Sequence, residues 1–236
     1  MTSAFAALDR LERGGRPPDE GFHTSLLGVI ASAGFASGDR FVCGVWQRSP
    51  LGPIADLMWA APDGRRRLVA GTAETAAFVS AVYGFDEVVV DPGFSGRIAA
   101  GRVVAVDAPL LGLRLRARAG RGWPIPLLGP PWVTRYLAAP VARRVMGVQT
   151  YGASPSGVRE WYRARWYRPV VDGEASVDGL DLGPLGPLDP PVRFGFSEPP
   201  RRPSVVSVRP LLHDPSGQIA RALSSSSPAA SRRAAL

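Results

Sequence analysis

Side chains that could carry out chemistry are most concentrated at 160–170, where the sequence reads EWYRARWYRPV. A strand here would alternate its side chains between two sides. One side would hold Glu160, Tyr162, Ala164, Trp166 and Arg168, and the other would hold Trp161, Arg163, Arg165 and Tyr167. A carboxyl group desolvated beside tryptophans has a raised pKa, which suits proton transfer near neutral pH. We therefore predict Glu160 and Tyr162 as catalytic groups, and Arg168 and Trp166 as groups that bind the substrate.

Three interpretations of this stretch are open. Trp and Tyr suit a pocket wall or a barrel core, because the ring packs while its polar atom finds a partner. The same residues would suit a solvated edge strand. Rings and arginines together can also bind nucleic acid, although the sequence has no RRM, KH, zinc-finger or helix-turn-helix pattern. We favour the pocket.

The chain is strongly basic, and its basic residues are unevenly distributed. The formal net charge is +8, and all 28 basic residues are Arg. Thirteen of them lie between 97 and 168, against only Asp107 and Glu160. Within that region LRLRARAGR alternates as a strand, with Arg114, Arg116 and Arg118 on one side. These arginines either face water or bind a phosphate or carboxylate, and Arg114 and Arg116 are predicted to contact the substrate.

The composition excludes several kinds of catalysis. Without Lys, Schiff-base chemistry, pyridoxal phosphate attachment and a P-loop are impossible. Cys43 is the single cysteine, and His23 and His213 are the only histidines, so neither a Cys-rich nor a three-His metal site can form within one chain. No Gly-x-Ser-x-Gly or Gly-x-Gly-x-x-Gly motif occurs. We predict no metal and no cofactor.

Short strand-like runs separated by Gly and Pro turns dominate the pattern. They predict a strand-dominated α+β fold, with an antiparallel sheet curled into a barrel or cone and two or three helices at one side. Asp63-Gly64 marks a hairpin turn. Helices are expected at 72–83, with Thr72 as N-cap, and at 131–146. Strands are predicted at 26–33, 41–47, 54–61, 66–70, 86–91, 102–107, 111–119, 158–170, 192–197 and 204–212.

The chain length suits one domain. We place a β-rich ligand-pocket domain at 21–213, after a helix and linker at 1–20 and before a Ser, Ala and Arg tail at 214–236 that is predicted to be disordered. The first residues do not form a signal peptide, and the longest uncharged run is too polar for a good membrane span. A cytoplasmic protein is expected.

The Pro-rich segment 122–147 carries Trp132 among other apolar residues, and its prolines oppose regular strand pairing. It is interpreted as a lid over a pocket mouth, as an interfacial membrane anchor, or as a packed crossover. On the first interpretation Trp132 contacts the substrate.

One stretch, RSPLGPIADLMWA at 48–60, resembles the Gly-Pro-Tyr-x-Glu strand of the acetoacetate decarboxylase-like superfamily. Gly52-Pro53 match, with Ile54 in place of Tyr and Asp56 in place of Glu. The resemblance implies a β-cone over roughly residues 40–210 around an apolar cavity, with Asp56 as its acid. Because those decarboxylases form a Schiff base on Lys, that activity is excluded here.

Two functions from different classes follow. The first is a pocket protein for a small apolar organic molecule, either neutral or anionic. This protein is either a carrier or an acid–base isomerase, lyase, hydrolase or cyclase that uses Asp56, Glu160, Tyr162 or His23. The second is a non-catalytic module whose basic band at 97–168 contacts nucleic acid or anionic lipid. We favour the first, and the sequence does not determine the substrate or the oligomeric state.

Overall fold

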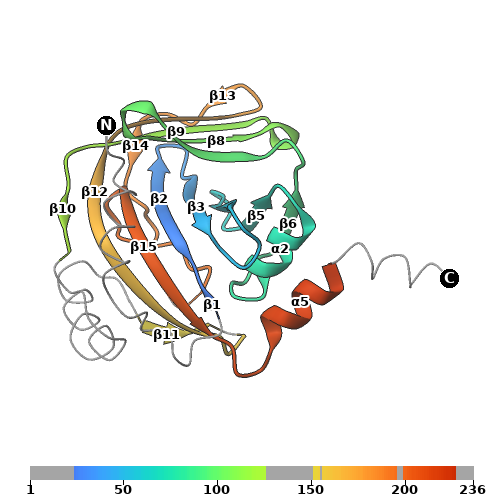
Figure 1. Ribbon diagram of the computed structural model, residues 1–236. Coiled ribbons are helices and arrows are strands. Elements are labelled where there is room, and N and C mark those ends of the chain that lie inside the picture. Colours follow the sequence, from blue (N-terminus) through green and yellow to red (C-terminus); the bar gives the residue numbers. More distant parts are fainter. Residues whose placement is uncertain (1–23, 126–150, 155, 196–198, 227–236) are drawn as a thin grey trace.

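The computed structural model describes residues 24–125, 151–154, 156–195 and 199–226, and the statements below concern these residues. Their strands form one curled sheet, an open half-barrel, with two helices beside it (Figure 1). The helices α2 (Ala73–Ser80) and α5 (Gln218–Ser226) lie next to each other. The predicted strand-dominated fold with a curled sheet is therefore confirmed. No helix in the described part of the chain has the length and apolarity that a bilayer crossing requires.

The sheet is antiparallel except for one parallel pair, β5 with β6. Its main order is β6 (Glu87–Val90), β5 (Arg66–Ala70), β4 (Ile54–Ala60), β3 (Arg40–Arg48), β2 (Leu27–Phe35), β15 (Ser204–His213), β12 (Arg159–Val177), β9 (Leu113–Ala119), β8 (Val103–Ala108) and β7 (Ser95–Ala99). Short strands pair beside this path: β1 (Thr24–Ser25), β10 (Trp123–Pro124), β11 (Tyr151–Ala153), β13 (Leu180–Asp181) and β14 (Leu185–Gly186). Two 3-10 turns, η1 (Ala100–Arg102) and η2 (Pro109–Leu111), flank β8.

The inner face of the half-barrel is filled with apolar side chains from both halves of the sheet. Phe41, Leu57 and Val69 from one half pack in the same cluster as Val106 and Leu115 from the other. The interior predicted to hold a ligand is thus occupied by the protein's own core among the described residues.

The outer face of the sheet packs against the helices. Leu68 of β5 and Val208 of β15 share a cluster with Phe78 and Val79 of α2 and Ile219 of α5. Burial of these side chains on both faces accounts for the stability of a sheet that would otherwise be open on one side.

The two ends of the sheet are joined by the turn at Asp91–Phe94. The Phe94 N–H donates to the Asp91 carbonyl at 2.9 Å, and the Asp91 carboxylate accepts from the backbone of Gly93 and Leu110 at 2.8 and 2.9 Å. After this turn β7 packs near Ala55 and Cys43, where only a glycine fits, since a Cβ at Gly96 would lie 2.8 Å from that of Ala55. In the described residues, β7 at one end of the sheet therefore packs over β3 and β4 without hydrogen-bonded pairing to them.

The sequence correctly predicted one hairpin turn and one helix cap. The hairpin at 62–65 forms, with Gly64 at φ +86 and the Ala61 N–H bonded to the Arg65 carbonyl. Helix α2 starts after Thr72, whose hydroxyl accepts from the Thr75 N–H at 3.1 Å.

Several predicted boundaries need correction. Strand β7 was not predicted, β12 continues to Val177, and residues 192–195 form no strand. Helix α5 occupies part of the predicted disordered tail, with Ile219 buried. The expected helix within 1–20, the helix at 131–146, His23, Trp132 and the tail at 227–236 lie outside the described residues.

Candidate functional site

Asp56 is a buried acid on β4 with an incomplete set of hydrogen bonds. It is 1% exposed, and the Trp46 indole donates to its Oδ1 at 2.8 Å. Its Oδ2 accepts no hydrogen bond among the described residues. Burial raises the pKa of Asp56 to about 7, and the bond from Trp46 opposes this rise. Near neutral pH this group can therefore either hold or release a proton.

Two glycines create the space for the Trp46 indole. Gly44 pairs with Asp56, and a Cβ at Gly44 would collide with Trp46 Nε1 and Asp56 Oδ1. A Cβ at Gly28 would lie 2.9 Å from the Trp46 ring. The indole consequently lies against the backbone of β2 and β3, which fixes its N–H on the carboxyl group.

Glu160 forms a second buried acid site with two tyrosines. It is 0% exposed, and its Oε2 accepts from the Tyr83 hydroxyl at 2.9 Å. That hydroxyl is also 2.6 Å from the hydroxyl of Tyr162. Glu160 Oε1 has no partner among the described residues. Burial raises the pKa of Glu160 to about 8, opposed by the bond from Tyr83.

The two acid sites belong to one cluster on the outer face of the sheet. Burial raises the pKa of Tyr162, with the charge of Glu160 and then that of Asp56 adding to this effect. Tyr83 lies three residues after the end of α2, and its hydroxyl contacts both Glu160 and Tyr162 of β12. We name Asp56, Trp46, Tyr83, Glu160 and Tyr162 the acid–tyrosine cluster.

The predicted grouping of β12 side chains is wrong beyond Ala164. The register with β15 shifts there, because Ala164 pairs with Val208 while Trp166 pairs with Ser207. This β-bulge reverses the sides of the following residues. Trp166 and Arg168 therefore do not share a side with Glu160, and the Arg168 guanidinium instead lies 5.1 Å from the Trp166 ring centre.

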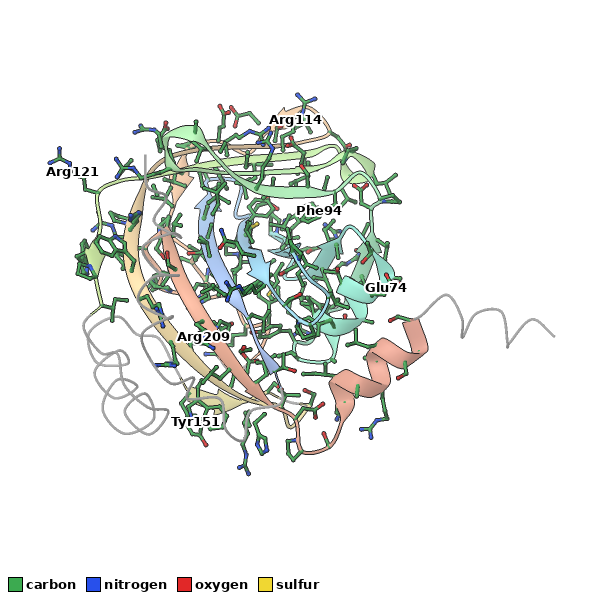
Figure 2. All side chains as sticks on the ribbon, viewed as in Figure 1. Glu74, Phe94, Arg114, Arg121, Tyr151 and Arg209 are labelled. Atoms are coloured by element: carbon green, nitrogen blue, oxygen red, sulfur yellow. The ribbon has the colours of Figure 1, made fainter. Side chains whose placement is uncertain are left out.

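The arginines of β9 also lie apart from the acid–tyrosine cluster. Arg116 donates to Asp107 at 2.9 Å and to the Val106 carbonyl at 3.0 Å. Arg114 is exposed and lies at the periphery of the molecule (Figure 2). Of the predicted residues that the structure describes, Asp56, Glu160 and Tyr162 form one group, and Arg168 lies with Trp166 in a second. Arg114 and Arg116 lie apart from the acid–tyrosine cluster.

An open groove of about 780 Å³ lies where the sheet does not close. One wall comes from the ends of β3 and β4 and the start of α2, and the other comes from β7 and Phe94. Phe94 lies between the β7–β9 and β3–β5 parts of the sheet (Figure 2). Most lining side chains are apolar, among them Val45, Trp46, Ile54 and Ile98, and Arg97 is the single charged residue that lines it in the described chain.

The groove and the acid–tyrosine cluster meet at Trp46. This residue lines the groove and also holds Asp56, whose chain neighbours Ile54 and Ala55 line the groove too. Sequence reasoning missed Trp46 and Tyr83. Gly28 and Gly44 inside strand-like runs were a usable signal for a close approach at Trp46, whereas nothing near Tyr83 marks it as a partner of Glu160.

The described residues contain no group of three His, Cys, Asp or Glu side chains placed to hold a metal ion. No known family model matches the sequence, and comparisons with curated proteins and with solved structures likewise find no match. The resemblance to the acetoacetate decarboxylase-like superfamily stays a prediction.

Proposed function

We propose that the protein binds a small, mostly apolar organic molecule in the groove between β4 and β7. The observation that carries this proposal is the groove itself. Its volume of about 780 Å³ falls within the ~300–1,000 Å³ typical of small-molecule sites. Its lining is largely apolar with a few polar groups, including Thr75 and Ser95, which is the usual composition of a ligand site.

Acid–base catalysis without metal or nucleotide is the enzymatic form of the proposal. Asp56 is the acid best placed for it, since Trp46 connects it to the groove wall. With a pKa of about 7, Asp56 has both protonation states populated at neutral pH. Isomerase, lyase, hydrolase and cyclase reactions all use such a group.

Glu160 and Tyr162 do not line the groove. The catalytic role of Glu160 and Tyr162 stays a prediction. In this proposal they are buried residues that stabilise the outer face of the sheet. A cytoplasmic location is part of the same proposal.

The test is a binding screen by thermal unfolding and titration calorimetry with small apolar molecules. A ligand present at about 100 times its Kd should add about 2.7 kcal/mol of stability. Ile98→Glu places a charge in the groove at an exposed position, and we expect it to weaken binding at least tenfold.

Val88→Glu is the matched control. Val88 is exposed on β6 and does not line the groove, so this variant introduces the same charge on a strand elsewhere. Equal losses of affinity in both variants would show that the groove is not the binding site. Ligands that bind Ile98→Glu as tightly as the unchanged protein would show the same.

A further inference from the structure

Four arginines from separate parts of the chain lie near the place where β9 ends and β10 pairs with β12. They are Arg102, Arg121, Arg168 and Arg202. Arg102 Nη1 donates to the Gly120 carbonyl at 3.2 Å, directly beside Arg121. Gly122 follows, and a Cβ there would lie 2.6 Å from Arg168 Cγ. Because Gly122 has no side chain, the start of β10 can pass over Arg168.

Main-chain hydrogen bonds hold the segments that carry these arginines side by side. The Gly120 N–H donates to the Pro169 carbonyl at 2.8 Å, and the Val170 N–H donates to the Pro203 carbonyl at 2.9 Å. Burial lowers the pKa of Arg168, and the positive charge of Arg102 lowers it further. Burial raises the pKa of Tyr167, and the charge of Arg202 opposes that rise. We name Arg102, Arg121, Arg168 and Arg202 the arginine cluster.

The arginine cluster differs from the other basic groups nearby in having no acidic partner among the described residues. Arg116 pairs with Asp107, Arg118 with Asp172 at 3.3 Å, and Arg201 with Asp189 at 2.6 Å. Among the described residues, no carboxylate lies within ion-pair distance of the four clustered arginines. Mutual repulsion without an internal counter-charge favours an external anion.

Aromatic rings stand on both sides of this cluster. Trp123 of β10 is 55% exposed, and its ring centre is 4.9 Å from that of Tyr167. Trp166 lies under Arg168, and its indole N–H is shielded from water and donates to no described group. Exposed indole beside guanidinium groups is the combination that stacks bases and holds phosphates.

We propose that the arginine cluster and Trp123 bind a single-stranded nucleic acid. The arginines contact its phosphates, and a base stacks on Trp123. This site is separate from the groove and does not depend on the proposed function.

Geometry favours a flexible strand over a membrane surface. Trp123 pairs with Tyr167, and Trp166 and Arg168 point to the opposite side of β12. The site therefore wraps around the short strand β10, which lies at the margin of the sheet (Figure 1). A flat bilayer can contact one of these sides at a time, whereas a single strand can follow the edge.

The test measures fluorescence anisotropy of a labelled oligothymidylate or oligouridylate of about 20 nucleotides, at low and moderate salt. We expect Arg121→Glu to weaken binding about tenfold and the double variant with Arg202→Glu to weaken it further, with a shallower salt dependence. Trp123→Ala should weaken binding about tenfold through lost stacking. Arg121 and Arg202 are exposed and make no ion pair with described residues, so these variants should unfold at the same temperature as the unchanged protein.

Arg114→Glu is the matched control. Arg114 is exposed and peripheral like Arg121 but lies away from the arginine cluster (Figure 2). An equal loss of affinity in Arg114→Glu would mean that binding depends only on net charge, and the proposed site would then be wrong. No binding at low salt would also overturn it, as would binding to phosphatidylserine vesicles without binding to either oligonucleotide.

Discussion

Two neighbouring residues of β4 show how the inner and outer faces of the sheet differ. Leu57 is 0% exposed and belongs to the apolar inner core, while Asp56 is 1% exposed and belongs to the acid–tyrosine cluster on the outer face. Both are equally removed from water. The inner face gains free energy from burial alone, whereas the outer face holds two carboxyl groups that are stable only when protonated or fully hydrogen-bonded.

This contrast implies that the stability of the outer face depends on pH and that of the inner face does not. Natural cores rarely bury acids without a counter-charge. Here Asp56 and Glu160 each keep one oxygen without a described partner. Buried acids that lower the stability of the fold in this way are typical of a functional site.

The largest expected effect is the pH dependence of the free energy of unfolding. The pKa values of Asp56 and Glu160, about 7 and about 8, are raised above those of the unfolded chain, so the folded state binds more protons. Their contribution is complete below about pH 4 and is lost as pH rises through 7 and 8. We expect a decrease on the order of 9 kcal/mol between pH 4 and pH 8.5, measured by urea unfolding.

The double variant Asp56→Asn with Glu160→Gln should abolish most of this slope. Both amides keep an acceptor for Trp46 and Tyr83 and cannot ionise. The variant should therefore be more stable than the unchanged protein at pH 8.5. A slope that persists in the double variant would place the titrating groups elsewhere.

The inner face provides the second prediction. Leu57→Ala should destabilise the protein by about 3 kcal/mol, because it leaves a cavity in the packed core. The loss should be the same at pH 5 and pH 8.5, measured by the same urea titrations. If the loss changed with pH, the two faces would be coupled more closely than their separate clusters suggest.

Sequence alone predicted the two faces unequally. The alternation of LRLRARAGR correctly placed Leu113 and Leu115 inside, because a regular strand keeps its period of two. The bulge after Ala164 broke that rule in β12. Its position depends on the register with β15, which no local pattern encodes, and the side chains of Trp166 and Arg168 were therefore assigned to the wrong side.

The acid–tyrosine cluster was predictable only in part for a similar reason. Glu160 could be recognised as a single acid among aromatic and basic residues of a strand-like run, and Asp56 was singled out through the resemblance of 48–60 to a family strand. Their partners could not, since Tyr83 is 77 residues from Glu160 in the chain and reaches it only because α2 packs on the outer face. Contacts of this kind arise from tertiary packing, which composition and periodicity do not specify.

A third, smaller effect would show how Trp46 tunes Asp56. Trp46→Phe keeps an aromatic ring above Gly44 but removes the donor to Asp56 Oδ1. The free energy of unfolding should fall by about 1–2 kcal/mol at pH 8.5 and by less at pH 5, because the hydrogen bond favours the ionised form of Asp56. In the Asp56→Asn background the pH dependence of this loss should disappear. A loss that is the same at both pH values in the unchanged Asp56 background would mean that Trp46 acts through packing.

The smallest expected effect concerns an ion pair that is exposed to solvent. Arg118 and Asp172 form an ion pair at 3.3 Å, and their side chains are 53% and 65% exposed. Solvent and salt screen such a pair, so Arg118→Ala should change the free energy of unfolding by less than about 0.5 kcal/mol, and less still at high salt. The free energies are measured by urea unfolding at two salt concentrations. A larger change would mean that the pair fixes the register of β9 on β12 at the register shift between Val170 and Asp172. This exposed ion pair at the edge of the sheet would then determine local structure, as the buried acids do on the outer face.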